Sequence, residues 1–277
     1  MLNALTIDLE EFFHTHNLKQ CWAPEAWREA PSRAPVLVPR ILEALDRGGA
    51  RCTWFVLGWM AENASDLVKR IADCGHEIGC HGYSHCLVYE QGPESFREDL
   101  LRATEAIERV TGTRPTAFRA PCFSITRRSL WALDTLRDCG YEIDSSIFPI
   151  ARRFYGIPDF PRHPHRLANG LVEFPLTVLD FAGRALPVAG GGYVRLAPKF
   201  LIPRLLRRVM ALGRPVNFYC HPWEFDLDEP RPQGIPLQKR LRHSLGRKSF
   251  FRLFERLLAE MSWAPISEVV NAHVAPE

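Results

Sequence analysis

The sequence predicts an α/β fold in which parallel strands alternate with helices. Short β-rich runs and amphipathic helical patterns follow one another along the chain, and Gly residues repeatedly mark the helix ends. Polar side chains stand where several of the strands end, which is where parallel β/α barrels place their chemistry. The chain has 277 residues and is 46% apolar, which suits one α/β barrel or two small domains.

The first half of the chain shows the alternation most clearly. Residues 36–46 carry Leu37, Ile41 and Leu45 on one helical face, and the pattern stops at a Gly pair. Residues 95–111 carry a similar apolar face that ends at Gly112. The expected elements are a strand ending near Asp8, a helix at 36–46, a strand at 52–57, a helix at 62–74, a strand from 76, a helix at 95–111 and a strand at 116–119.

The second half continues in the same way, with a longer irregular stretch in its middle. The expected elements are a helix at 127–139, a strand at 141–144, an extended region at 171–180, a helix at 198–212, a strand at 216–221 and a last helix at 248–261. No linker, low-complexity tract or long repeat interrupts this order.

Composition excludes several classes of protein. A net charge of +3 is too small to indicate nucleic-acid binding, and no apolar run is long enough for a transmembrane helix. The N-terminus has no basic region, apolar core or cleavage site of a signal peptide, so we expect a cytoplasmic protein, with contact at the inner face of the membrane left open. The eight cysteines are scattered without a Cys-x-x-Cys pair, which favours reduced thiols.

Two histidines follow the strand expected from residue 76. His81 and His85 are four residues apart after a Gly-rich turn, so both rings can reach one metal ion. A divalent ion that activates water also needs another ligand and an open position. His76 begins the strand and lies at its far end, so we interpret it as structural.

The first strand ends in carboxylates that can complete such a site. Asp8 and Glu10 are two residues apart, so strand alternation places both on one face. One would bind the metal while the other acts as a base, and Glu11 competes as a ligand if the strand ends earlier. The donor types favour zinc, with cobalt or nickel as alternatives.

Two further strands end abruptly at a proline. Arg119 precedes Pro121 by two residues and can orient a neighbouring carboxylate through charge-assisted hydrogen bonds. His221 directly precedes Pro222 and suits a general acid.

These segments, in this order, resemble the five motifs of the NodB-type polysaccharide deacetylases, carbohydrate esterase family 4. The matching segments span about residues 5–225 and are Thr6-Ile7-Asp8-Leu9-Glu10, His81-Gly82-Tyr83-Ser84-His85, Phe118-Arg119-Ala120-Pro121, Tyr141-Glu142-Ile143-Asp144-Ser145-Ser146 and Tyr219-Cys220-His221-Pro222-Trp223. Details of the first, fourth and fifth segments are similar to the branch associated with exopolysaccharide biosynthesis. The resemblance implies one domain with a distorted parallel (β/α)7-type barrel and a family-specific extension over about 225–277.

The resemblance also implies a role for each motif residue. Asp8 would be the general base, and Arg119 would orient it. His221 would be the general acid, and Asp144 would tune the acidity of His221. The implied metal ligands are Glu10, His81 and His85. The implied reaction is removal of N-acetyl groups from an amino sugar in a polysaccharide or lipid-linked glycan. Two positions depart from the family pattern. Most of the family has two adjacent aspartates in the first motif, whereas here Glu10 stands one residue later, and Cys122 stands where an aromatic residue often follows the proline of the third motif.

Substrate contacts are expected near the same site. A backbone N–H of Tyr83 or Ser84 would hold the oxyanion, and Trp223 would stack on a sugar ring. The Gly-rich stretch before Tyr193 predicts a flexible rim segment that brings Tyr193 and Arg195 to the glycan. Basic residues that either face an anionic glycan or membrane or form solvated helix faces are Arg204, Arg207, Arg208, Arg214, Lys239, Arg240, Arg242, Arg247 and Lys248.

Three other functions remain open on sequence alone. The same scaffold could hydrolyse another C–N amide, such as a formamide or a cyclic amide. Two histidines and a carboxylate also occur in iron(II) oxygenases, although the α/β pattern and the distant His221 argue against that class. A non-catalytic sugar-binding protein would not need Asp8 and His221 together.

Overall fold

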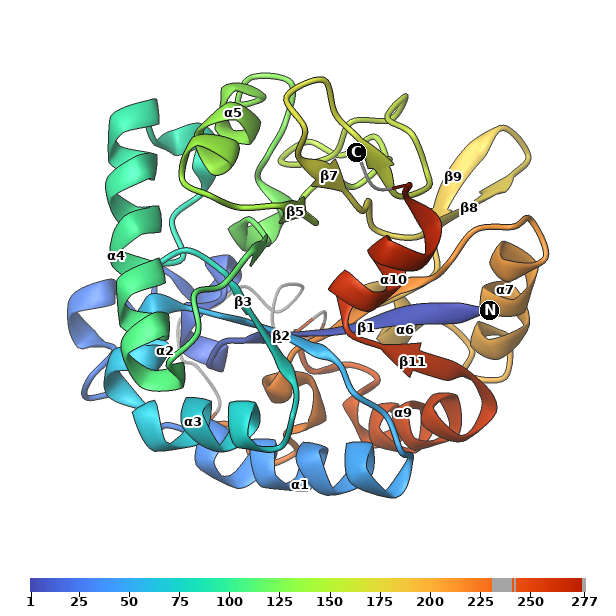
Figure 1. The fold of residues 1–277 in the computed structure, drawn as a ribbon. Coiled ribbons are helices and arrows are strands. Elements are labelled where there is room, and N and C mark those ends of the chain that lie inside the picture. The colour runs from blue at the N-terminus through green and yellow to red at the C-terminus, as the bar shows by residue number, and fades with distance from the viewer. Residues whose placement is uncertain (231–240, 242, 276–277) are drawn as a thin grey trace.

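The computed structural model describes residues 1–230, 241 and 243–275, which form a curled sheet with helices around its outside (Figure 1). The strands of the nine-stranded sheet are β1 (Leu2–Leu9), β2 (Thr53–Val56), β3 (Glu77–Cys80), β4 (Ala117–Phe118), β5 (Ile143–Asp144), β6 (His165–Arg166), β7 (Val172–Glu173), β10 (Asn217–Cys220) and β11 (Ser262–Ala264). The helices are α1 (Ala34–Arg47), α2 (Gly58–Asn63), α3 (Ser65–Asp73), α4 (Pro93–Thr111), α5 (Trp131–Asp138), α6 (Gly191–Leu196), α7 (Ile202–Met210), α9 (Arg247–Glu260) and α10 (Ile266–His273).

The sheet is an incomplete parallel barrel. Its order is β10-β1-β2-β3-β4-β5-β7-β6, with β11 also paired to β1, and among the described strands of this sheet the antiparallel pair is β6 with β7. A separate hairpin joins β8 (Val178–Phe181) and β9 (Arg184–Pro187). The gap between β10 and β7 is bridged by Asn217, whose Nδ2 donates to the carbonyl of Phe174 at 2.9 Å. The predicted distorted parallel barrel is confirmed.

The strand register brings the polar strand ends to one edge. Leu9 pairs with Val56, Val56 with Cys80, Cys80 with Phe118, and Phe118 with Asp144. The residues one position further along each chain therefore lie side by side at the carboxyl edge. These neighbouring residues include Glu10, His81, Arg119 and Ser145. The candidate site therefore lies at the carboxyl edge of the sheet.

Side chains alternate between the inside and the outside of the curved sheet. Ile7 and Leu9 belong to the large outer core beneath the helices, whereas Ala4 belongs to an inner cluster with Phe55. Helix α10 closes this inner cluster through Ile266 and its neighbours. The segment expected as a C-terminal extension thus contributes β11 and α10 to the same barrel.

Several elements differ from the sequence expectation. The helix expected at 62–74 begins at Ser65, because Ala64 leaves the helical region at φ −139° and ψ 43° and separates α2 from α3. Helix α6 occupies part of the Gly-rich stretch that was expected to be flexible, and Gly190 there pairs with Tyr219. The β8–β9 hairpin and α10 were not anticipated.

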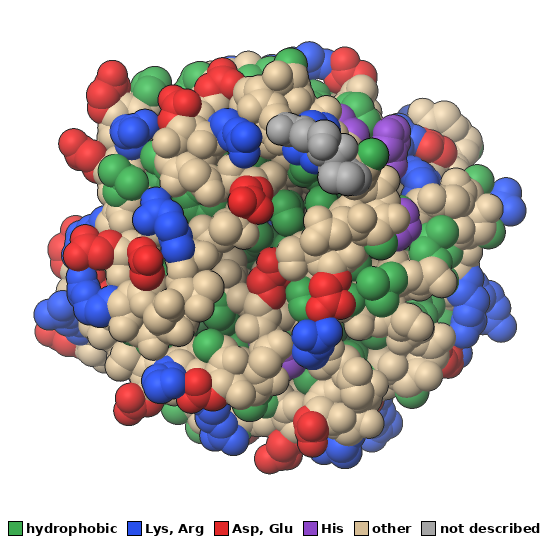
Figure 2. Space-filling model, viewed as in Figure 1, with side chains coloured by type: hydrophobic (Ala, Val, Ile, Leu, Met, Phe, Trp, Pro, Cys, Tyr) green, Lys and Arg blue, Asp and Glu red, His purple; other side chains and the backbone are tan. Residues whose placement is uncertain are grey.

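The surface on the side seen in Figure 2 carries acidic and basic side chains interspersed with one another. Within the described residues, no helix combines the length and the apolar character needed to cross a bilayer. All eight cysteines are free thiols, as the sequence predicted.

Candidate active site

Glu10, His81 and His85 form a buried cluster suited to a metal ion. One ligand atom from each residue lies within 4.8 Å of the others. Glu10 follows β1, His81 follows β3, and His85 lies within the next loop with a left-handed φ of 54°. The Nε2 atom of His85 is 2.7 Å from Oε2 of Glu10, an oxygen that otherwise has no hydrogen-bond partner. Two imidazole nitrogens and a carboxylate oxygen fit the preferences of zinc.

Hydrogen bonds with neighbouring residues orient the side chains of His81 and Glu10 toward this cluster. His81 Nδ1 lies 2.7 Å from the carbonyl oxygen of Arg119, so Nδ1 carries the proton and Nε2 is left as the ligand atom. Burial lowers the pKa of His81 to about 4, which keeps the ring neutral near pH 7. Trp223 Nε1 donates to Oε1 of Glu10 at 3.0 Å and leaves Oε2 directed at the histidines.

Glu11 has a structural role instead. Its Oε1 accepts hydrogen bonds from the backbone N–H groups of Arg33 and Ala34, both at 2.8 Å, where α1 begins. Ser32 Oγ donates to the same oxygen at 2.5 Å. Carboxylates stabilise helix N-termini by satisfying free N–H groups. Glu10 is therefore the carboxylate that the fold brings to the histidines.

Asp8 is held by Arg119 at the floor of the site. Arg119 Nη1 lies 2.8 Å from Oδ1 of Asp8, and both side chains are almost fully buried. The second oxygen of Asp8, Oδ2, lies 3.6 Å from Nε2 of His221. Arg119 thus makes the predicted contact with Asp8, and the other Asp8 oxygen stays on the side of His221.

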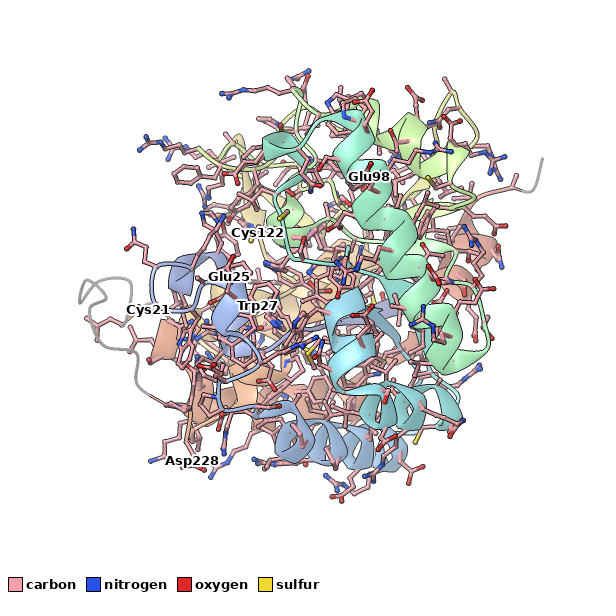
Figure 3. All side chains as sticks on the ribbon, turned by 90° about the vertical axis from the view of Figure 1, so that its left-hand side faces the viewer. Cys21, Glu25, Trp27, Glu98, Cys122 and Asp228 are labelled. Atoms are coloured by element: carbon pink, nitrogen blue, oxygen red, sulfur yellow. The ribbon has the colours of Figure 1, made fainter. Side chains whose placement is uncertain are left out.

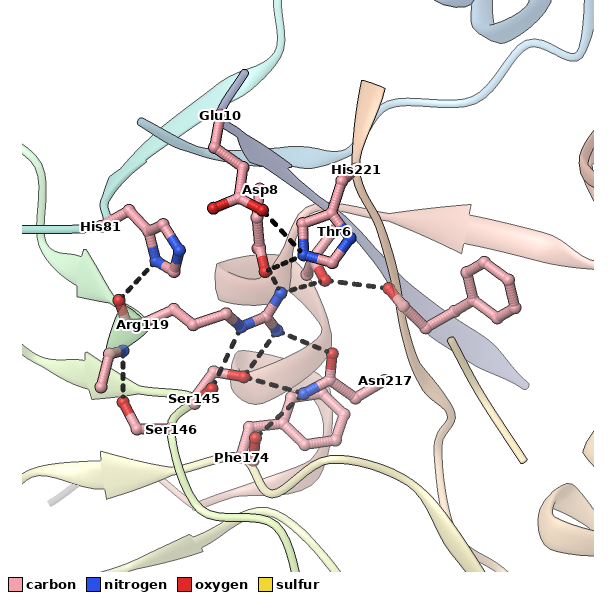
Figure 4. A network of polar contacts seen from close by, with 12 residues as sticks. Thr6, Asp8, Glu10, His81, Arg119, Ser145, Ser146, Phe174, Asn217 and His221 are labelled. Carbon is pink, nitrogen blue, oxygen red and sulfur yellow. Dashed lines mark hydrogen bonds and ion pairs between the residues drawn. The ribbon is translucent and has the colours of Figure 1, made fainter. Parts of the chain in front are cut away.

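The guanidinium of Arg119 uses each of its five N–H donors (Figure 4). Besides Asp8, it donates to Thr6 Oγ1 at 2.6 Å, to the carbonyl and hydroxyl oxygens of Ser145, and to Oδ1 of Asn217 at 3.3 Å. The acceptors come from β1, β10 and the residue that follows β5. Arg119 therefore ties together both sides of the incomplete barrel.

His221 is oriented by Glu224, three residues along the chain. Nδ1 of His221 lies 3.0 Å from Oε2 of Glu224, and the other Glu224 oxygen accepts from Arg195 Nε at 2.5 Å. Nε2 of His221 is thereby free to face Asp8 and Glu10, whose Oε1 is 3.5 Å away. Burial disfavours the charged ring, but Glu10, Glu224 and Asp8 outweigh it and raise the pKa of His221 to about 9. His221 can therefore carry a proton beside the cluster of Glu10, His81 and His85.

Asp144 does not contact His221, which corrects the expected tuning role. Asp144 pairs with Phe118 of the neighbouring strand, and Phe118 and Leu9 point into the outer core. Side chains at paired positions of a sheet point to the same face, so Asp144 points away from the barrel interior. Its Oδ1 accepts from Ser146 Oγ at 2.5 Å, and it pairs with Glu173. The next residue, Ser145, faces inward and contacts Arg119.

The N–H groups expected to hold an oxyanion are already engaged. The backbone N–H groups of Tyr83 and Ser84 donate to the two oxygens of Asp99, at 2.7 Å and 3.2 Å. The Tyr83 hydroxyl donates to Glu62 and accepts from Arg102, both at 2.6 Å. Tyr83 is therefore held by α2 and α4, and neither its N–H group nor that of Ser84 is free to hold an oxyanion.

Trp223 and Arg195 are also buried rather than exposed to substrate. The Trp223 indole stacks between the rings of His221 and His243, with centroids 5.0 Å and 4.8 Å away, so neither face is free for a sugar. Arg195 is 3% exposed and bound to Glu224. Tyr193 remains partly exposed, and its hydroxyl lies 2.6 Å from that of Tyr155.

The expected basic residues do not form one surface. Arg247 is buried with its guanidinium 5.3 Å from the Trp223 ring, and Arg214 is half-buried. Arg207 pairs with Glu260 at 2.5 Å. Arg204, Arg208 and Lys248 are exposed, whereas Lys239, Arg240 and Arg242 lie outside the described residues.

Sequence reasoning missed two side chains near the site, Glu224 and His14. The spacing of His221 and Glu224 is that of a capping box, which was a readable signal for their pairing. His14 was also missed: its Nδ1 accepts from the Glu11 N–H at 3.1 Å, and its buried Nε2 has no partner.

In Figure 3 the segment that follows His14, with Cys21, Glu25 and Trp27 labelled, lies on the same side of the molecule as Cys122.

Comparison with known proteins finds two family models that match successive segments of the chain. Residues 29–143 match the family described as polysaccharide deacetylase, and residues 145–271 match a domain of unknown function, DUF3473. Residues 29–143 are thus similar to polysaccharide deacetylases. The two matches meet at β5, within one sheet, and both contribute to the site: His81 and Arg119 come from the first, His221 and Glu224 from the second.

Named relatives show the same similarity. The chain is 35% identical over 174 residues to a peptidoglycan-N-acetylglucosamine deacetylase of Bacillus cereus, covering 58% of this chain and 62% of the relative. It is 37% identical over 110 residues to a peptidoglycan deacetylase of Helicobacter pylori, covering 40% and 36% of the two chains. The chain thus spans less than two thirds of either relative.

A crystal structure from Mycobacterium smegmatis, described as a polysaccharide deacetylase, has the same fold. The superposition has a TM-score of 0.65 at 22% identity and covers 99% of this chain and 91% of the other.

Proposed function

We propose that this protein is a metal-dependent hydrolase that removes N-acetyl groups from amino sugars of a glycan. The observation that carries the proposal is the meeting of three potential metal ligands with a carboxylate and a histidine at one barrel edge. Nε2 of His221 lies 3.6 Å from Asp8 and 3.5 Å from Glu10. A metal-binding protein without catalysis would not require Asp8 and His221 to face each other there.

Each residue has a chemical role in this proposal. Glu10, His81 and His85 would hold a divalent ion, which supplies a more acidic water and polarises the amide carbonyl. Asp8, oriented by Arg119, takes the proton from the attacking water. His221 gives its proton to the amide nitrogen as the C–N bond breaks, so the products are acetate and a free amine. Glu224 holds His221 in the orientation that keeps Nε2 toward the reacting atoms.

A cleft lined by aromatic rings, close to His14, supports a sugar substrate. A cavity of about 360 Å³ is lined by Phe13, Trp27 and Trp59, together with residues before α1 and residues of α2. Trp27 and Trp59 also pack against His14, with ring centroids 4.4 Å and 4.9 Å away. Aromatic rings with polar neighbours are suited to contact sugar rings.

The names of the relatives support a glycan that contains N-acetylglucosamine, since both are named for peptidoglycan deacetylation. Zinc as the ion, a role in exopolysaccharide biosynthesis and a cytoplasmic location are further parts of this proposal, and they stay predictions from the sequence.

Acetate release from N-acetylated chitotetraose tests the proposal. The wild type should release acetate, and Asp8→Asn and His221→Ala should each lower turnover by about 100-fold or more, because each removes a proton-transfer group. His163→Ala is the matched control, since His163 is exposed and outside the site.

Formate release from N-formylated substrates, without any acetate, would favour the alternative amide hydrolase. Unchanged turnover in His221→Ala would contradict the assigned acid.

A further inference from the structure

A second cavity lies next to the site and has a different chemical character. It has a volume of about 450 Å³, within the usual range of ligand pockets. It is formed between the turn after Ile125 and the loop at 151–158. Its lining residues are Tyr89, Thr126, Arg127, Arg128, Arg152, Arg153, Phe154, Tyr155, Gly156 and Pro158.

Arginines dominate this cavity, which we call the arginine pocket. Its lining contains four guanidinium groups and no carboxylate. Arg127 pairs with Asp159 outside the lining, and Arg152 Nε donates to the Tyr193 hydroxyl at 3.0 Å. Arg128 and Arg153 form no ion pair with any residue that the structure describes, and both are exposed. Three of the four guanidinium charges, those of Arg128, Arg152 and Arg153, thus have no carboxylate partner among the described residues, and an anion bound between them would relieve their mutual repulsion.

Aromatic rings connect the arginine pocket with the reaction site. Tyr155, in the pocket lining, lies 6.3 Å from the Phe123 ring, and Phe123 lies 4.9 Å from Tyr219. The Arg119 guanidinium, which holds Asp8, is 5.9 Å from the same Phe123 ring. One layer of rings therefore separates the pocket from the catalytic floor. This separation suits one glycan chain that contacts both places.

We propose that the arginine pocket binds an acidic unit, a sugar carrying a carboxylate, of the same glycan whose N-acetyl group is removed. This inference rests on the proposed deacetylase function and narrows its substrate class to acidic glycans. Arginine is suited to the role because its planar guanidinium binds carboxylates through two parallel hydrogen bonds. The Tyr89 and Phe154 rings supply apolar surface for the sugar body.

Equilibrium binding tests this inference without requiring turnover. The probes are a hyaluronan tetrasaccharide, which alternates N-acetylglucosamine with glucuronate, and neutral N-acetylated chitotetraose. The wild type should bind the acidic probe more tightly, and Arg128→Gln/Arg153→Gln should weaken that binding by about tenfold or more while leaving the neutral probe unchanged. The charge-matched control is Arg204→Gln/Arg208→Gln on α7, which should leave both affinities as in the wild type.

Each outcome separates the two proposals. Equal affinity of the wild type for both probes, or an equal effect of the pocket variant and the α7 control on the acidic probe, would overturn the acidic-unit inference. If the pocket variant selectively loses the acidic probe but acetate is never released from either probe, the binding inference holds and the deacetylase proposal fails. A selective rise in KM for acetate release from the acidic probe would support both.

Discussion

His221 Nδ1 and Glu224 Oε2 are 3.0 Å apart, and this contact orients the candidate acid from within its own turn. Glu224 is fully buried and also binds Arg195. Burial disfavours its charge, but Arg195 and His221 lower its pKa to about 2. Glu224 therefore stays ionised at neutral pH and holds the Nδ1 proton of His221.

Replacing Glu224 with Gln should reduce turnover without emptying the metal site. The amide keeps the shape but not the charge that favours protonated His221, so we expect kcat to fall by about 10-fold to 100-fold. Acetate release and metal content of the same preparation give the measurement. Asp144→Asn is the comparison variant, and a larger loss of kcat there than in Glu224→Gln would restore the role first expected for Asp144.

Replacing Trp223 with Phe should weaken metal binding. The change keeps an aromatic ring between His221 and His243 but removes the hydrogen bond to Oε1 of Glu10. Loss of such an outer partner lowers metal affinity by about 10-fold to 100-fold. A competition titration with a chelator measures this, and an unchanged affinity would show that the indole N–H does not position Glu10.

Replacing Arg119 with Leu should destabilise the whole barrel. The change leaves Asp8 buried without its cationic partner and removes contacts to β10 and Ser145. Breaking a buried ion pair on one side costs about 3–5 kcal/mol in the free energy of unfolding. Urea unfolding gives the value, and Arg119→Leu/Asp8→Asn should recover part of it because the stranded charge is removed.

The Asp144–Glu173 pair should make stability depend on pH. Burial raises the pKa of Glu173 well above its usual value, and the neighbouring Asp144 charge adds to this, so the folded state holds a proton that the unfolded chain releases. This contribution is fully present below the unfolded pKa near 4.5 and is lost as the pH rises through the raised folded value.

Glu173→Gln removes the titrating group and tests the pair. Its free energy of unfolding, relative to wild type, should increase as the pH is raised above about 5 toward 8. Urea unfolding at several pH values gives the comparison. Parallel pH curves for the two proteins would show that the pair does not share a proton.

The sequence predicted that Glu10, His81 and His85 lie together, because each belongs to a local motif at or after the end of a strand. Asp8 and Glu10 follow the alternation of one strand, and His81 and His85 follow another, so parallel register alone brings them together. Arg119 was also predictable, since it ends its strand beside Pro121.

Other parts of the site depend on details that a sequence pattern does not reveal. The register of β4 against β5 decides whether Asp144 or Ser145 faces Arg119, and a shift of that register by one residue would exchange the two. Arg195 and Trp223 looked like surface residues because their partners, Glu224 and His243, come from other segments. The arginine pocket likewise combines Tyr89 with two loops about 25 residues apart, which only the folded chain brings together.

Acetate release during zinc addition to chelator-treated protein tests the central claim most directly. With N-acetylated chitotetraose as substrate, the metal-free protein should be inactive, and the rate should rise linearly until one zinc is bound per chain. Glu10→Gln should require far more zinc for the same rate. Full acetate release by the metal-free protein, or none at any zinc concentration, would contradict a deacetylase built on Glu10, His81 and His85.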